Sequence, residues 1–283
     1  MRKTTENSSH GIQWGDRKLG DFDFGDDVAL VSQSMEEIQK LTDDLGELGS
    51  RVGLVINKDK TKSMVFGNSQ TSNVIINGES MENKKGFTYL GSYIQDDGDA
   101  GADVRIRIGK AAAVFRKLGP IWKLSSLNNN TKICLYMSIV VPTALYACET
   151  WKKTAAITRN LDVFHRRCLR SILHITWRDH VRNEEVMSRA GVGNLSDMVD
   201  NRRWKFAGHV IRMGSERLAR TALEWIPEGG RRGRGRPKKT WRSTFSEDMM
   251  TRGTCWEEAR SRAFDRGWWR ELADQCSFRN GWT

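Results

Sequence analysis

Residues 21–30 read Asp-Phe-Asp-Phe-Gly-Asp-Asp-Val-Ala-Leu, two short apolar runs joined at Gly25-Asp26. Apolar runs on both sides of such a pair predict a β-hairpin with a two-residue turn. The tip of this hairpin presents the carboxylates of Asp26 and Asp27. Carboxylate oxygens suit Mg²⁺, and paired metal ions about 3.5–4 Å apart stabilise phosphoryl transfer. Gly-Asp is also a favoured turn dipeptide, and surface Asp pairs are common, so the turn alone leaves both interpretations open.

The residues after the hairpin predict a helix and then further short strands. Residues 34–37 have the Ser-x-x-Glu form of a capping box, and apolar residues recur at helical spacing from Met35 to Leu48. Residues 63–66 are strand-like, residues 73–78 predict a strand leading into an Asn-Gly turn, and residues 87–92 predict another strand and turn.

These segments, in this order, resemble the palm of reverse transcriptases encoded by LINE-type (non-LTR) retrotransposons. The metal-binding Phe-Ala-Asp-Asp hairpin of that family would be Phe24 to Asp27. Its helix and its Gly-Leu-x-Ile-Asn-x-x-Lys-Thr-Lys segment would lie within residues 34–62, and its Tyr-Leu-Gly strand would be Tyr89 to Gly91. Later segments resemble the RTE-like clade most closely, so the resemblance covers nearly everything after residue 10: residues 103–111, 145–151, 203–210, 235–241 and 254–259.

The resemblance implies an RNA-directed DNA polymerase that extends a DNA primer on an RNA template with Mg²⁺. Asp26 and Asp27 would hold the metal. Lys60 or Lys62 would lie near the triphosphate and could act as general acid to the pyrophosphate, and the sequence does not choose between them. The implied partners are DNA and RNA, with no small-molecule cofactor other than the nucleotide.

The chain departs from the family pattern in two places. Gly25 stands where the family has Ala, and glycine tolerates the same turn. Only about twenty residues precede the hairpin, where the family has its fingers and the first half of the palm with another metal-binding Asp. Asp21 and Asp23 lie on the same hairpin and cannot replace a carboxylate from a separate strand. We therefore expect the back half of a polymerase, inactive on its own.

The expected fold class is α+β, with a partial palm at 1–97, a helical thumb-like region at 98–195 and a basic helical C-terminal region at 196–283. The apolar spacing predicts helices at 104–118, at 130–140 with Pro142 kinking or ending it, and at 157–172. The last of these would turn Leu161, Phe164, Cys168, Leu169 and Ile172 inward and leave His165, Arg166, Arg167 and Arg170 on its polar face.

The C-terminal stretch from Trp256 to Cys276 predicts a surface helix that docks through Trp268, Trp269 and Leu272. Several Trp residues elsewhere sit beside Arg or Lys, where packing in a core is a commoner role than stacking on bases.

Positive charge is concentrated in one segment. Residues 201–242 hold thirteen Lys and Arg against three acidic residues, a balance of +10 within a chain whose net charge is +11. A localised basic segment is the electrostatic sign of phosphate binding. The nucleic-acid-binding candidates are Arg202, Arg203, Arg231, Arg232, Arg234, Arg236, Lys238 and Lys239.

The densest part of this segment contains Arg234-Gly235-Arg236-Pro237, which resembles an AT-hook. In that motif an extended Arg-Gly-Arg lies in the narrow, strongly negative minor groove of A·T-rich DNA. The alternatives are a solvated loop and a nuclear import signal.

Composition indicates an intracellular protein, nuclear or cytoplasmic, with no membrane partner. No apolar run reaches the ~18 residues that a membrane span needs. The first ten residues are polar, and the five Cys lack paired spacing, which favours reduced thiols. Besides the polymerase fragment, two interpretations stay open: a non-catalytic nucleic-acid-binding protein that uses residues 201–242, and a genomic relic without function.

Overall fold

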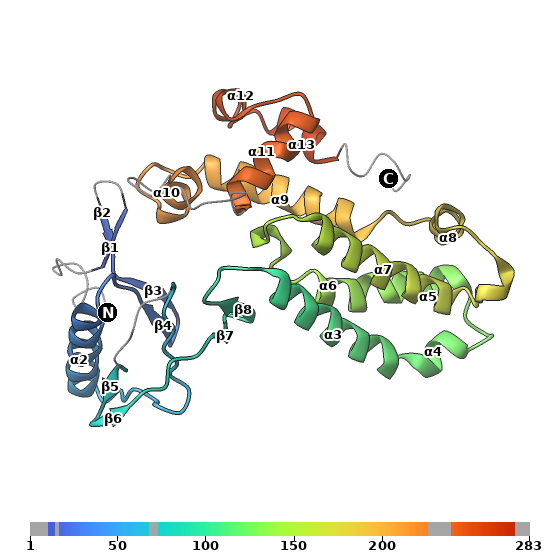
Figure 1. Ribbon diagram of the computed structural model, residues 1–283. Helices are drawn as coiled ribbons and strands as arrows, with labels where there is room; N and C mark the ends of the chain where they lie inside the picture. The colour runs from blue at the N-terminus through green and yellow to red at the C-terminus, as the bar shows by residue number, and fades with distance from the viewer. Residues whose placement is uncertain (1–10, 15–16, 68–72, 226–238, 275–283) are drawn as a thin grey trace. The chain divides into compact units, whose positions relative to one another are not determined.

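The computed structural model describes residues 11–14, 17–67, 73–225 and 239–274. The chain divides into two units, Met1–Asp99 and Ala100–Thr283 (Figure 1). The predicted regions 98–195 and 196–283 therefore fall almost wholly within the second unit. No helix within the described residues is both long and apolar enough to cross a lipid bilayer.

The described part of the first unit contains small hairpins and one long helix. Its described strands form four separate two-stranded antiparallel sheets. Their bounds are β1 (Ile12–Trp14) with β2 (Arg17–Leu19), β3 (Asp21–Phe24) with β4 (Asp27–Leu30), β5 (Ile75–Ile76) with β6 (Glu79–Ser80), and β7 (Gly86–Tyr89) with β8 (Ser92–Gln95). The helix is α2 (Met35–Arg51).

The predicted hairpin around Gly25 is present. Phe24 pairs with Asp27, which leaves Gly25 and Asp26 as the two-residue turn. Gly25 has φ +65°, a left-handed conformation that glycine adopts without a Cβ penalty. A positive φ at the first turn position alone is the type II′ pattern, which suits the twist of the flanking strands.

Helix α2 begins where the sequence predicts it. The Ser34 hydroxyl accepts a hydrogen bond from the Glu37 amide at 3.1 Å, as an N-cap should. Gln39 ties the helix to β5, because its side-chain amide donates to the Ile75 carbonyl and its oxygen accepts from the Ile75 amide. Leu41, fully buried, anchors the inner face of the helix.

The other hairpin predictions have mixed outcomes. Asn77-Gly78 forms the predicted turn, and Leu90-Gly91 forms a similar one, each with positive φ at both residues. The predicted strand at 63–66 is wrong, because only Ser63 makes a bridge there, to Asn83. These residues have a composition that favours a strand, but a strand also needs a neighbouring segment that pairs with it along its length.

The first unit has little core of its own. Among its described residues the buried apolar ones are Leu19, Leu41, Val74 and Ile76, whereas Phe24 is 68% exposed and Val55 82%. Both apolar clusters found among the described residues belong to the second unit. Most of the free energy from apolar burial therefore lies in the second unit.

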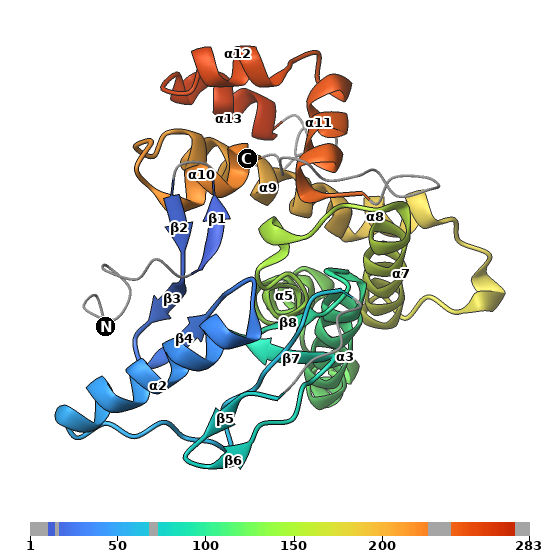
Figure 2. The same ribbon diagram turned by 60° about the vertical axis from the view of Figure 1, so that its left-hand side comes forward.

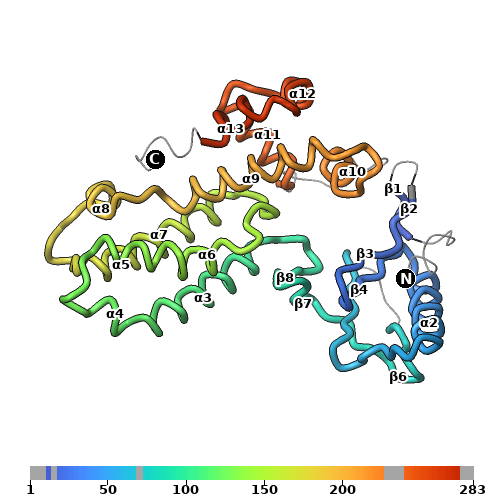
Figure 3. The backbone as a smooth tube through the Cα atoms, turned by 180° about the vertical axis from the view of Figure 1, so that it is seen from behind, coloured from blue at the N-terminus to red at the C-terminus, as the bar shows by residue number. Residues whose placement is uncertain are grey.

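The second unit is helical and contains two adjoining cores. The first core involves α3 (Gly101–Lys117), α4 (Gly119–Lys123), α5 (Asn129–Leu135), α6 (Val141–Ala144), α7 (Ala155–Ile172), α8 (Asn183–Ala190) and the start of α9 (Leu195–Ile211). The second core joins the rest of α9 to α10 (Leu218–Glu224), α11 (Trp241–Thr251), α12 (Trp256–Ser261) and α13 (Arg266–Asp274). Helix α9 packs against α7 in the first core and against α13 in the second, so it belongs to both cores (Figure 3).

Pro142 neither ends nor visibly breaks its helix. A π-helical turn, Tyr136–Val140, joins α5 to α6, and the Val141 amide bonds back to the Tyr136 carbonyl. Proline lacks the amide that a regular helix would use, and the wider turn just before it accommodates that loss. The Thr143 hydroxyl donates to the Ile139 carbonyl at 3.0 Å, which satisfies a second carbonyl in this region.

The inward face predicted for the third helix is confirmed in α7. Leu161, Phe164, Cys168, Leu169 and Ile172 are all buried. The placement of His165 on the polar face is wrong, because the imidazole is fully buried. Its Nε2 lies 3.1 Å from the Gly193 carbonyl oxygen and its Nδ1 lies 2.8 Å from the Tyr136 hydroxyl. A carbonyl only accepts, so Nε2 holds the proton and the Tyr136 hydroxyl donates to Nδ1.

The buried imidazole predicts acid sensitivity. Burial lowers the pKa of His165 from 6.5 to about 4. The unfolded chain therefore takes up a proton at a higher pH than the native chain does. The free energy of unfolding is therefore unaffected by His165 above about pH 6.5. It falls by about 3 kcal/mol as the pH drops from 6.5 towards 4.

Urea unfolding at pH 7.5 and pH 4.5 measures this loss. His165→Phe should reduce the difference between the two pH values, because its side chain cannot be protonated. An unchanged pH difference in the His165→Phe protein would contradict the assignment to His165.

The C-terminal stretch forms two short helices, α12 and α13, where one was predicted. The break falls between Ser261 and Arg266. The docking residues were correctly predicted, since Trp269 and Leu272 are buried and Trp268 is partly buried in the second core.

Candidate functional site

The candidate carboxylates Asp26 and Asp27 are both exposed at the tip of the β3–β4 hairpin. Side chains of directly paired residues lie on the same face of a hairpin, and faces alternate along each strand. Asp27 pairs with Phe24. Asp21 pairs with Leu30 and Asp23 with Val28, and these pairs alternate along the hairpin with the pair that contains Asp27. The register therefore places Asp21 and Asp23 on the face opposite to Asp27.

The hairpin that contains the Tyr-Leu-Gly segment contacts the Asp hairpin. The Tyr89 hydroxyl donates to the Phe22 carbonyl at 3.3 Å. Burial raises the pKa of the Tyr89 phenol, and the nearby charges of Asp27 and Asp23 raise it further. Burial, followed by the charge of Asp21, also raises the pKa of Asp23. The Tyr89 hydroxyl thus lies near the acidic hairpin, a placement that the sequence pattern did not predict.

The two candidate lysines lie in a turn after α2. Both side chains are exposed. The Lys62 ammonium donates to the Asp59 carbonyl at 2.7 Å, and the backbone amide of Lys60 donates to Asn57. Both contacts are local to the turn, and within the described part of the chain no ion pair joins either lysine to Asp26 or Asp27.

Two carboxylates alone do not complete a polymerase-type metal site. Hard divalent cations take six or more oxygen ligands, and paired-metal sites need carboxylates that bridge both ions. Asp26 and Asp27 could supply ligands to one ion whose other ligands are water. Within the described residues no three His, Cys, Asp or Glu side chains gather closely enough to hold a metal.

Most of the basic candidates lie outside the described residues: Arg231, Arg232, Arg234, Arg236 and Lys238. Of the other three, Lys239 lies with its ammonium 2.6 Å from Glu247. Arg202 is exposed, and its guanidinium donates to the Leu145 carbonyl at 2.8 Å.

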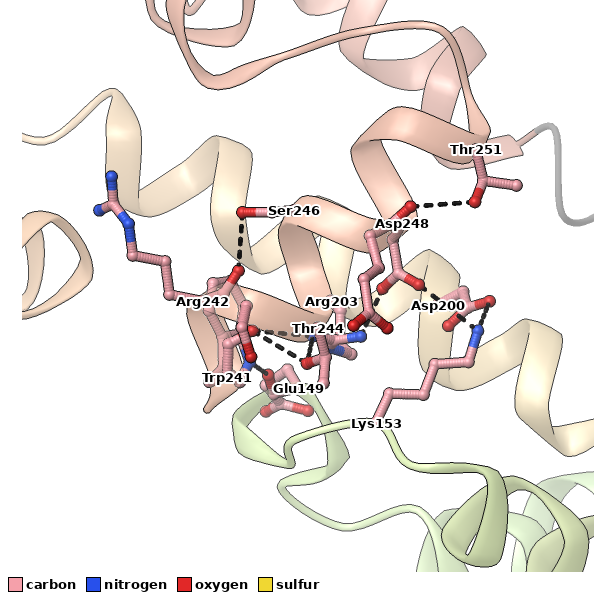
Figure 4. Close-up of polar contacts among 12 residues, drawn as sticks. Glu149, Lys153, Asp200, Arg203, Trp241, Arg242, Thr244, Ser246, Asp248 and Thr251 are labelled. Carbon is pink, nitrogen blue, oxygen red and sulfur yellow. Dashed lines mark hydrogen bonds and ion pairs between the residues drawn. The ribbon is translucent and has the colours of Figure 1, made fainter. Parts of the chain in front are cut away.

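Arg203 corrects the sequence prediction. Its side chain is 0% exposed, so it is not available to a phosphate. Its guanidinium forms an ion pair with Asp248 and donates to Thr244 at 2.8 Å and to the Trp241 carbonyl at 3.3 Å (Figure 4). The sequence contained this signal, because Val199, Arg203 and Ala207 are spaced four apart on one buried face of α9.

Further charges extend this contact, and we call Lys153, Asp200, Arg203 and Asp248 the Arg203 network. Lys153 lies 2.6 Å from Asp200 and 3.7 Å from Asp248 (Figure 4). Burial raises the pKa of Asp248, and the charges of Arg203 and Lys153 oppose that rise. The network joins α9 to α11, so it is a structural feature and not an exposed binding surface.

Other arginines of the basic segment also bond within the protein. Arg212 donates to the Ala263 carbonyl, Arg220 to Met213 and Arg242 to Leu223, at 2.8–3.2 Å. A large part of the charge in the described portion of 201–242 therefore helps to hold helices together. The exposed exceptions are Lys205 and Arg217.

One known protein resembles the chain over most of its length. It is a Caenorhabditis elegans protein described as uncharacterized and transposon-derived, 25% identical over 245 residues, which cover 83% of this chain and 87% of that protein. No family model matches the chain. No solved structure matches it. The similarity to the nematode protein supports a transposon origin for this chain.

Proposed function

We propose that this chain is a nucleic-acid-binding protein derived from a retrotransposon RNA-directed DNA polymerase and that it does not itself polymerise. The observation that supports it most is the order of three elements along the chain. A hairpin with Asp26 and Asp27 at its tip comes first, the capped helix α2 follows, and the hairpin of Tyr89, which contacts Phe22, comes last. The transposon-derived relative supports the origin.

Binding is the part of this function that the charge distribution favours. Residues 231–239, the densest part of the basic segment, contain six Lys and Arg and no acidic residue, a composition that suits a polyanion. We assign DNA or RNA as the partner because each Lys or Arg that neutralises a phosphate releases a counterion from the nucleic acid, and the regularly repeated phosphates allow many such contacts. A minor-groove interaction of Arg234 and Arg236 with A·T-rich DNA is the finer form of this proposal.

Polymerisation is not expected, for a geometric reason. Asp26 and Asp27 share one turn, and the hairpin register directs Asp21 and Asp23 to the other face. Among the described residues, a metal-assisted phosphoryl transfer would lack the further carboxylates that hold two ions together, and several kcal/mol of transition-state stabilisation are lost with them.

One sample tests both halves of the proposal. A labelled oligo(dT) primer on poly(rA) should bind the purified chain, with affinity that falls as salt rises, yet should not be extended with Mg²⁺ or Mn²⁺ and dTTP. Asp26→Ala should leave binding unchanged. Template-dependent extension that Asp26→Ala abolishes would refute the inactive assignment, and absence of binding at low salt would refute the nucleic-acid function itself.

A further inference from the structure

A shallow depression of about 330 Å³ opens on the outer face of α7. The residues that line it come from α7 and from the first residue of α8: Val163, Arg166, Arg167, Arg170 and Asn183. Positions three and four apart on a helix lie on one face, so the three guanidinium groups gather on a single surface. None of the described residues of the basic segment 201–242 contributes to this lining.

Local charge at this surface is positive although most of the chain is nearly neutral. Residues 159–182 contain six Arg and two Asp. Both acids bond within the protein: Asp162 accepts from the Ser196 amide and hydroxyl at 3.1 and 2.9 Å, and Asp179 accepts from Thr176. On α8, Glu185 forms an ion pair with Arg189. The depression is therefore suited to an anion.

Arg170 holds the loop that follows α7 in place. Its carbonyl accepts from the Ile175 amide at 2.9 Å, and its guanidinium donates to the Val181 carbonyl at 2.8 Å and to Asn183 at 3.0 Å. The loop is thus fastened to one residue near both of its ends. Arg170 is engaged in this way, which leaves Arg166 and the exposed Arg167 as the free-standing cations of the depression.

Trp177 lies on that loop and is 78% exposed. The loop projects from the helical bundle between α7 and α8 (Figure 2). A short turn with a capping box between Thr176 and Asp179 fixes its conformation, and the Arg178 guanidinium lies 5.5 Å from the indole centroid. Ile175 is two residues away, so the Trp177 backbone lies within about 7 Å of the fastened base of the loop.

We propose that this surface binds single-stranded nucleic acid, with Arg166 and Arg167 contacting phosphate oxygens and Trp177 stacking on one base. An exposed tryptophan alone is ordinary, and guanidinium groups alone would accept any anion. Together they offer a π-face on a loop that is fastened to the arginine-bearing helix α7, and single strands use this combination of base stacking and phosphate contacts. A duplex would satisfy the arginines only, because its bases are already stacked.

Fluorescence anisotropy of a labelled dT₁₂ strand tests the proposal on the full chain. Arg166→Ala/Arg167→Ala should flatten the dependence of log K on log salt by about 1.4 units, at ~0.7 per phosphate contact on a single strand. Trp177→Ala should weaken binding about tenfold with little change in that slope, because stacking releases few counterions. Trp177→Phe should restore most of the affinity.

The matched control is Arg105→Ala/Lys110→Ala, which removes two exposed charges from α3. Equal effects of the two double variants would show that only net charge matters and would overturn the site. A Trp177→Ala effect of the same size on a blunt duplex would overturn the stacking role. A variant in which the six Lys and Arg residues of 231–239 are replaced with Ala separates this inference from the proposed function. If that variant alone abolishes binding, and the α7 and Trp177 variants do not weaken it, the function stands and this site does not.

Discussion

Arg203→Met should lower the free energy of unfolding by about 3–5 kcal/mol, because it leaves the half-buried carboxylate of Asp248 without its main partner. The same change removes the donors to Thr244 and to the Trp241 carbonyl. Lys153, at 3.7 Å from Asp248, compensates only in part. Urea unfolding followed by circular dichroism gives the change directly.

Two variants make this result specific. Arg202→Met, on the same helix, removes a guanidinium that donates to the Leu145 carbonyl and pairs with no carboxylate in the described part of the chain, and should cost about 1 kcal/mol. Arg203→Met/Asp248→Leu should recover part of the loss, because an apolar pair avoids the uncompensated charge. If Arg203→Met cost no more than Arg202→Met, the Arg203 network would not be what joins α9 to α11.

Replacing Arg231, Arg232, Arg234, Arg236, Lys238 and Lys239 with Ala should give the largest change in nucleic-acid binding. The slope of log K against log salt on duplex DNA should flatten by about 5 units, at ~0.9 per phosphate neutralised. Lys239 should contribute least, since its ammonium already lies 2.6 Å from Glu247. Titrations of one duplex between low and high salt measure both slopes.

The finer, minor-groove form of the proposal is tested by Arg234→Ala/Arg236→Ala. An AT-hook should lose its preference for A·T-rich duplex, whereas a generic basic loop should weaken evenly on all sequences. Four exposed charges of α3, Arg105, Lys110, Arg116 and Lys117, form a control set that should have less effect per charge removed.

The six-residue prediction has its own contradicting outcome. If the six-residue variant bound as tightly as wild type at every salt concentration, the binding surface would lie elsewhere on the protein.

The sequence determined the features that depend on neighbouring residues. Gly25 fixes the hairpin turn because it adopts φ +65° without strain. Ser34 fixes the start of α2, and the apolar spacing of α7 gave its buried face. Each of these follows from interactions within about one turn or one hairpin, which a short stretch of sequence contains in full.

Tertiary structure decided the features whose partners lie far along the chain. Arg203 and His165 look like surface residues by type, but Asp248 and Thr244 in one case, and Tyr136 and Gly193 in the other, satisfy their polar groups in the interior. The loop that contains Trp177 is held against the end of α7 by Arg170, whose partners Ile175 and Val181 lie further along the chain. Burial of a polar group becomes affordable only when a distant partner supplies its hydrogen bonds, and local sequence does not contain that partner.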